Sequence, residues 1–210
     1  MISAVLFDFG GVILSSPFEA FRAYEARAGL PVDTIRTINS TDPDTNAWAR
    51  LERSDIDVAT FVTEFEAEAA ALGHQVDGAE VIGCLRGELR PEMVEAVRRC
   101  KERFAVALLT NNIVSGDGGE VGSFADVVAM FDVVIESSVV GCRKPEPRFY
   151  EIALETLGVE ADQAVFLDDL GINLKPARAL GMTTIKVDDP AVALDELEAV
   201  LGISLRSELP

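Results

Sequence analysis

Residues 4–14, AVLFDFGGVIL, constrain the fold of this chain more than any other stretch. Four apolar residues run into a single carboxylate, Asp8, which Gly10 and Gly11 follow closely. A short apolar run bounded by a turn signal predicts a buried strand of a parallel sheet. A strand that ends on an Asp places the carboxylate at the carboxyl edge of the sheet, where open α/β folds bind ligands. The glycines allow a sharp turn and a close approach to a ligand, although an Asp that merely caps the turn would give the same pattern.

The chain from Pro91 onward alternates between apolar strand patterns and helical patterns. Strands are predicted at 104–109, 131–135, 164–167 and 183–187. Helices are predicted at about 91–103, around Val127 and Met130, and at about 147–157, 173–181 and 190–201, with a glycine-rich acidic loop at 116–122. Strands that alternate with helices predict an α/β fold, a doubly wound parallel sheet with right-handed crossovers.

The segment between the first strand and Pro91 carries helical signals and almost no strand signals. One helix follows Pro17 and ends at Gly29, a second lies around Trp48, and a third runs from an Asp57 N-cap through Leu72. A further short helix is predicted at 81–89. The sequence therefore predicts a core domain of residues 1–15 and 91–210, with residues 16–90 inserted as a helical domain.

The charge of the chain excludes several classes of partner. With 18 basic and 36 acidic residues, the formal net charge is −18, which repels phosphate backbones and anionic lipid, so we expect neither nucleic-acid nor membrane binding. Small anionic substrates fit only where a metal ion or a lysine reverses the local sign. The three cysteines form no CxxC pair and no spanning or leader segment is evident, so a cytoplasmic location is expected. The sequence does not predict an oligomeric state.

Polar residues follow four of the predicted strands and should meet at one edge of the sheet. They are Asp8, Thr110 with Asn111, Lys144, and Asp168 with Asp169. Each alone could be a helix cap or a solvated side chain. Together they form a chemical set: acidic groups that converge on one point repel each other unless a cation lies between them, and carboxylate oxygens suit Mg²⁺. A lysine and a hydroxyl–amide pair could then hold phosphate oxygens, and a free carboxylate could attack phosphorus.

These ordered motifs resemble those of the haloacid dehalogenase (HAD) superfamily. The motifs are FDFGGV, LLTNN, GCRKPEPRFY and VFLDDLGINLKPARALGM, and the last two also resemble the N-terminal phosphatase domain of soluble epoxide hydrolases. The resemblance covers the first strand and the chain from about Pro91. The helical insertion matches the cap domain of the superfamily in position and helicity.

The resemblance implies a role for each polar residue at the sheet edge. Asp8 would be the nucleophile and a metal ligand, and a small phosphorylated compound the substrate. Thr110 and Asn111 would bind the phosphoryl group, while Lys144 would neutralise it and steady Asp8. Asp169 would bind Mg²⁺ directly with Asp168 in support, and Asn173 would orient this pair.

One departure from the superfamily pattern affects the predicted chemistry. Phosphatases of this family usually carry a second Asp two residues after the nucleophile, where this chain has Gly10. The Gly10 carbonyl can still bind the metal, but proton donation to the leaving group, typically worth about 10²–10⁴-fold, is lost. Three functions remain open. The first is a metal-dependent phosphatase that is weak, uses another acid or water, or prefers good leaving groups. The second is a non-catalytic metal- or ligand-binding protein, and the third is a 2-haloacid dehalogenase, which releases halide without a proton.

Overall fold

The computed structural model describes residues 1–113 and 124–206, and the predicted loop at 116–122 lies outside this range. Its sheet has five parallel strands in the order β3-β2-β1-β4-β5. The strands are β1 (Ala4–Phe7), β2 (Ala105–Thr110), β3 (Val133–Glu136), β4 (Ala164–Asp168) and β5 (Thr183–Lys186). The first strand therefore lies in the centre of the sheet, and the predicted doubly wound α/β fold is confirmed.

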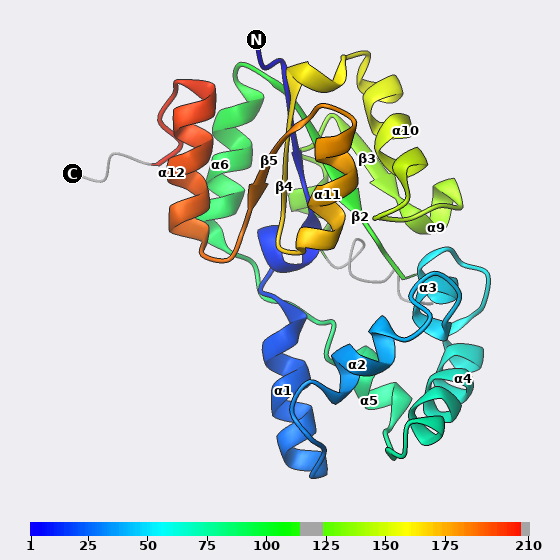
Figure 1. Ribbon diagram of the computed structural model, residues 1–210. Helices are drawn as coiled ribbons and strands as arrows, with labels where there is room; N and C mark the ends of the chain where they lie inside the picture. Colours follow the sequence, from blue (N-terminus) through cyan, green and yellow to red (C-terminus); the bar gives the residue numbers. More distant parts are fainter. Residues whose placement is uncertain (114–123, 207–210) are drawn as a thin grey trace.

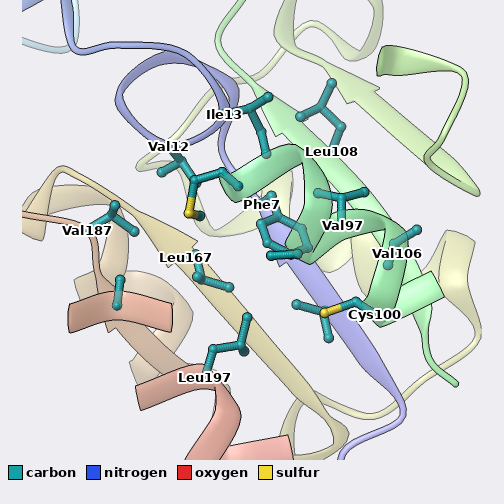
Figure 2. Packing of buried hydrophobic residues seen from close by; sticks show 14 of the residues in the cluster. Phe7, Val12, Ile13, Val97, Cys100, Val106, Leu108, Leu167, Val187 and Leu197 are labelled. Atoms are coloured by element: carbon teal, nitrogen blue, oxygen red, sulfur yellow. The ribbon is translucent and has the colours of Figure 1, made fainter. Parts of the chain in front are cut away.

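Side chains of β1 alternate between two separate hydrophobic layers. Val5 and Phe7 pack toward helices α6 (Pro91–Lys101) and α12 (Pro190–Leu201), in the cluster seen in Figure 2. Ala4 and Leu6 pack on the opposite face, against α10 (Pro147–Leu157) and α11 (Gly171–Ala179). Figure 1 shows the two pairs of helices on the two sides of the sheet. Because both faces are covered, all four residues of β1 are fully buried.

Shorter helical segments connect the strands. A wide helical turn, η1 (Phe9–Ile13), begins directly after Asp8, and the Leu14 N–H closes it by donating to the Phe9 carbonyl (2.9 Å). The others are α8 (Ala125–Val128), α9 (Ser137–Val140) and the 3₁₀ helix η2 (Ala161–Gln163). The turn after β1 thus brings the chain back over the carboxyl edge of the sheet.

A block of five helices follows η1 and lies beyond the carboxyl edge of the sheet (Figure 1). It comprises α1 (Pro17–Ala28), α2 (Thr34–Ser40), α3 (Ala47–Glu52), α4 (Val58–Ala71) and α5 (Gly78–Gly83). The block has its own hydrophobic cluster, in which Phe61 stacks on Phe65 with ring centroids 5.1 Å apart. The predicted N-cap is confirmed, because Asp57 Oδ1 accepts a hydrogen bond from the Thr60 N–H (2.8 Å). No helix within residues 1–113 and 124–206 is long and apolar enough to cross a membrane.

The short helix predicted at 81–89 is present, but its bounds are wrong: α5 begins at Gly78 and ends at Gly83. Residues 88–90 instead run antiparallel to 13–15: Leu89 pairs with Leu14, and the Arg90 N–H donates to the Ile13 carbonyl (2.9 Å). The reason is tertiary, because hydrogen bonds to a segment over 70 residues away replace those of a helix. The helix α2 was not predicted, since no helix was expected between Gly29 and the one around Trp48.

Candidate functional site

The carboxyl edge of the sheet brings together the polar residues that the sequence singled out. Parallel pairing sets Phe7 beside Leu108 on β2 and beside Leu167 on β4. Asp8 is the next residue after Phe7, so it lies beside Asp168, and its N–H donates to the Leu167 carbonyl (2.9 Å). Thr110, the last residue of β2, is buried at the same edge.

Lys144 lies at the centre of this edge and is 1 % exposed. Its ammonium contacts Asp8 Oδ1 (2.6 Å) and Asp168 Oδ2 (2.9 Å), and it donates to the Leu109 carbonyl (3.0 Å). Three acceptors therefore match the three protons of the ammonium group. Burial alone would lower the pKa of Lys144, but the charges of Asp168 and Asp8 raise it, so the side chain stays protonated.

Both carboxylate oxygens of Asp168 accept hydrogen bonds from its neighbours. Its Oδ1 accepts from the Leu170 N–H (2.8 Å) and from Asn173 Nδ2 (3.1 Å). Its Oδ2 accepts from Lys144 and from the same Asn173 nitrogen (3.1 Å). The Asn173 carbonyl in turn accepts a bond from the Tyr150 hydroxyl (2.7 Å). The expected contact of Asn173 with the acidic pair is therefore present, on the Asp168 side.

Asp8, Asp168 and Asp169 form a group that could hold a metal ion, with one ligand oxygen from each within 4.8 Å of the others. Burial, followed by the charge of Asp168, raises the pKa of Asp8 well above its usual range, against the pull of Lys144. Burial and the charge of Asp168 raise the pKa of Asp169 to about 6. Three carboxylates beside one ammonium leave two negative charges uncompensated. A divalent cation with a preference for oxygen ligands fits this set in charge and in ligand type.

The two glycines after Asp8 differ in what they allow. Gly11 has φ +78°, and a Cβ there would clash with the Asp169 carboxylate, so this close approach requires glycine. Gly10 has φ −66° and ψ 133°, which any residue adopts. Outside its neighbours and its own helical backbone, no atom lies within 4 Å of a Cβ at Gly10. The sequence pattern predicted a sharp turn and a close approach to a ligand at this pair; the close approach in the structure is that of Gly11 to the Asp169 carboxylate, and the approach to a ligand stays a prediction.

The Asn111 side chain is bonded to the chain around Lys144. Its Oδ1 accepts from the Lys144 N–H (2.9 Å), and its Nδ2 donates to the Lys144 carbonyl (2.9 Å). The same nitrogen donates to Glu52 Oε2 (3.1 Å) on α3. Both N–H groups of the amide are thus used within the protein.

Sequence reasoning missed three side chains that contact the predicted site residues. Ser16 Oγ donates to Asp169 Oδ2 (3.2 Å), Glu52 accepts from Asn111, and Arg143 forms an ion pair with Glu52 (2.6 Å). Arg143 directly precedes Lys144, and Ser16 precedes the first proline of a helix, which are weak local signals. Glu52 carries no such signal, because only the folding of the helical block brings it to the edge.

The model of the haloacid dehalogenase-like hydrolase family matches residues 2–181. The chain is 35 % identical over 214 residues to acyl-CoA dehydrogenase family member 10 of Mus musculus, and 34 % identical over 212 residues to bifunctional epoxide hydrolase 2 of the same organism. These matches cover 99 % and 93 % of the chain but only 20 % and 38 % of the two relatives. Phosphatase MT3486 of Mycobacterium tuberculosis (strain CDC 1551 / Oshkosh) is 30 % identical over 197 residues, which cover 89 % of this chain and 88 % of that protein.

Solved structures share the fold at lower sequence identity. A HAD family enzyme from Bacteroides thetaiotaomicron, in complex with magnesium and inorganic phosphate, has a TM-score of 0.58 and 18 % identity. The similarity covers 89 % of this chain and 94 % of that one. Three observations point to the same family: the five-stranded parallel sheet, the carboxylate cluster at its carboxyl edge, and the family match over most of the sequence. The chain therefore belongs to the haloacid dehalogenase-like hydrolases.

Proposed function

We propose that this hydrolase is a magnesium-dependent phosphatase that acts through an aspartyl-phosphate on Asp8. The observation that carries the proposal is the pair of contacts from Lys144 to Asp8 (2.6 Å) and to Asp168 (2.9 Å), beside Asp169. One buried cation thus joins the proposed nucleophile to the proposed metal site. Two comparisons support the same function. The match to phosphatase MT3486 covers most of that protein, and the structural neighbour is in complex with magnesium and inorganic phosphate.

In this mechanism a carboxylate oxygen of Asp8 attacks phosphorus, and the bond from phosphorus to the leaving oxygen breaks. The Phe9 N–H (2.6 Å) and Lys144 both bond to Asp8 Oδ1 and fix the orientation of the carboxylate. Thr110 donates to the phosphoryl oxygens, and Asn111 contributes through its main chain while its side chain positions Lys144. Water then hydrolyses the acyl phosphate and releases inorganic phosphate.

We propose Asp8, the Gly10 carbonyl and Asp169 as the residues that hold Mg²⁺, with Asp168 in support. Asp168 already accepts four hydrogen bonds, whereas Asp169 Oδ2 accepts one weak bond from Ser16. The ion would supply positive charge that offsets the charge of the phosphoryl oxygens.

The substrate class follows from Gly10. Because this position carries no acid, the leaving oxygen receives no proton from the residue that usually donates one, so an alkyl phosphate is a poor substrate. Aryl and acyl phosphates release weakly basic oxygens and need the proton less. We therefore propose a small phosphorylated compound with such a leaving group.

We propose residues 16–90 as a cap domain over the site. The helical block has its own hydrophobic cluster, and it contacts the core through the ion pairs Arg53–Glu146 (2.8 Å) and Glu52–Arg143 (2.6 Å). Glu52 is the last residue of α3 and Arg53 directly follows it, so both pairs come from the end of this helix. A block in this place would control which substrates reach Asp8.

The proposed function is tested with 4-nitrophenyl phosphate, Mg²⁺ and the Asp8→Asn variant. We expect turnover by the wild-type protein that requires Mg²⁺ and that Asp8→Asn abolishes. Equal turnover by both proteins would contradict the role of Asp8. No turnover by either protein would favour the second candidate function, a binding protein without catalysis. The absence of an acid at Gly10 is the observation that supports this candidate. Chloride release from 2-chloropropionate without metal would identify a dehalogenase instead.

A further inference from the structure

One buried carboxylate of the helical block, Glu52, contacts the edge of the sheet. Its Oε2 accepts hydrogen bonds from Arg143 Nη1 (2.6 Å) and Asn111 Nδ2 (3.1 Å), and its Oε1 accepts from Trp48 Nε1 (3.0 Å). The Glu52 side chain is only 11 % exposed. Three donors hold this carboxylate in one orientation, and one of them carries a positive charge.

The contact with Asn111 leads directly to the catalytic lysine. One N–H of the Asn111 amide faces Glu52, while the other N–H and the carbonyl oxygen bond to the main chain of Lys144 (both 2.9 Å). The Lys144 ammonium in turn contacts Asp8. The amide plane of Asn111 is therefore fixed from two sides, by Glu52 and by the main chain of Lys144.

We propose that Glu52 is a positioning residue for the reaction: it orients the Asn111 amide and, through the main chain of Lys144, the ammonium that contacts Asp8. The inference rests on the proposed function, because the position of Lys144 matters where Asp8 meets a phosphoryl group. Without the Glu52 acceptor, the Asn111 N–H that faces it has no partner among its present contacts. The amide is then held only by its two hydrogen bonds to the main chain of Lys144, and its orientation is less closely fixed.

The next residue along the chain, Arg53, directly follows α3 and provides a matched control. Arg53 also joins the helical block to the core, through Glu146 (2.8 Å), but it does not contact Asn111. Arg53→Gln therefore weakens the contact between block and core and leaves the Asn111 amide in place. Glu52→Met keeps about the length of the side chain and removes both acceptor oxygens, so all three donors, the Asn111 N–H among them, lose this acceptor.

The experiment measures two quantities: kcat and KM for 4-nitrophenyl phosphate, and the Kd of inorganic phosphate in the presence of Mg²⁺ by calorimetry. Loss of a hydrogen bond to a charged group predicts that Glu52→Met lowers kcat and weakens phosphate binding by about 10-fold. We expect Arg53→Gln to stay near the wild-type values. In the Asn111→Ala background, Glu52→Met should cause no further loss, because the group through which it acts is gone.

Three results would overturn the inference: wild-type values for Glu52→Met, an equal loss for Arg53→Gln, or additive losses in the double variant. If Glu52→Met does not fold, Glu52→Asp replaces it, since the shorter side chain keeps the charge but withdraws from Asn111. A wild-type protein that binds phosphate but turns over no substrate refutes the proposed function alone, and the phosphate affinities of the variants then still decide the role of Glu52. A wild-type protein that binds no phosphate refutes both.

Discussion

Restoring an acid at Gly10 is the sharpest perturbation that the structure allows. The backbone there has φ −66° and ψ 133°, and a Cβ would lie more than 4 Å from any atom outside its own turn and neighbours. Gly10→Asp should therefore fold without strain. Its carboxyl group would join a cluster in which burial and like charge already raise the pKa values of Asp8 and Asp169. The same environment should raise the pKa of the new group, which is the direction that a general acid requires.

The size of the effect depends on the leaving group. General acid catalysis is worth about 10²–10⁴-fold, which corresponds to about 3–5 kcal/mol of activation free energy. For an alkyl phosphate such as glycerol phosphate, we expect kcat/KM of Gly10→Asp to rise by at least about 10²-fold over wild type. For 4-nitrophenyl phosphate, whose leaving oxygen needs no proton, we expect a change of less than about 10-fold. The ratio of the two rates separates proton donation from a general effect on the site.

Gly10→Asn is the matched control, because it has nearly the same size but no acidic proton. The assay measures phosphate release from both substrates with saturating Mg²⁺, after calorimetry has shown that each variant binds the metal. The reasoning is refuted if Gly10→Asp binds Mg²⁺ and its alkyl-to-aryl ratio equals that of wild type or of Gly10→Asn. That outcome would mean that Gly10 is not the reason for slow turnover of alkyl phosphates.

Further perturbations test the charge and the packing of the same site. The pKa of Asp169 is raised from 3.8 to about 6, so the folded metal-free protein holds this proton more tightly than the unfolded chain does. Ionisation of Asp169 should therefore lower the free energy of unfolding as the pH rises. This destabilisation is absent below pH 4 and complete above pH 6, where it reaches at most about 3 kcal/mol. Asp169→Asn should remove this pH dependence from urea unfolding measured with EDTA, and an unchanged profile contradicts the prediction. Lys144→Met leaves Asp8 and Asp168 buried without their cation. We expect the free energy of unfolding in the same assay to fall by about 3–5 kcal/mol, and turnover to be lost. Stability within about 1 kcal/mol of wild type would show that the carboxylates take up protons at no cost. Gly11→Ala forces a positive φ and a clash with Asp169, so Mg²⁺ should no longer raise the Tm; a Tm increase equal to that of wild type would refute the close approach.

Local sequence signals predicted the elements whose ends are fixed locally. The helices α10 and α12 have the predicted bounds, because each begins with a proline and ends before a glycine in the left-handed conformation. The central strand β1 was predicted because it is buried on both faces and therefore apolar throughout. The segment at 84–90 was not predicted correctly, since its partner lies at 13–15 and no local pattern encodes that pairing. The strand β3 begins two residues later than predicted, because Asp132 uses its side chain to accept from the Val106 N–H (2.9 Å).

The same division between local and distant information applies to the site. Residue types at strand ends predicted which side chains would meet, because parallel pairing brings those ends to one edge. The role of each of these residues, as proposed nucleophile, metal ligand or cation, depends on distances that only the folded chain sets. Lys144 contacts Asp8 and Asp168 together, so the proposed nucleophile and the proposed metal site share one cation. A change in the charge of either carboxylate therefore alters the other through Lys144, and the effects of substitutions at Asp8 and Asp168 on metal affinity should not be additive.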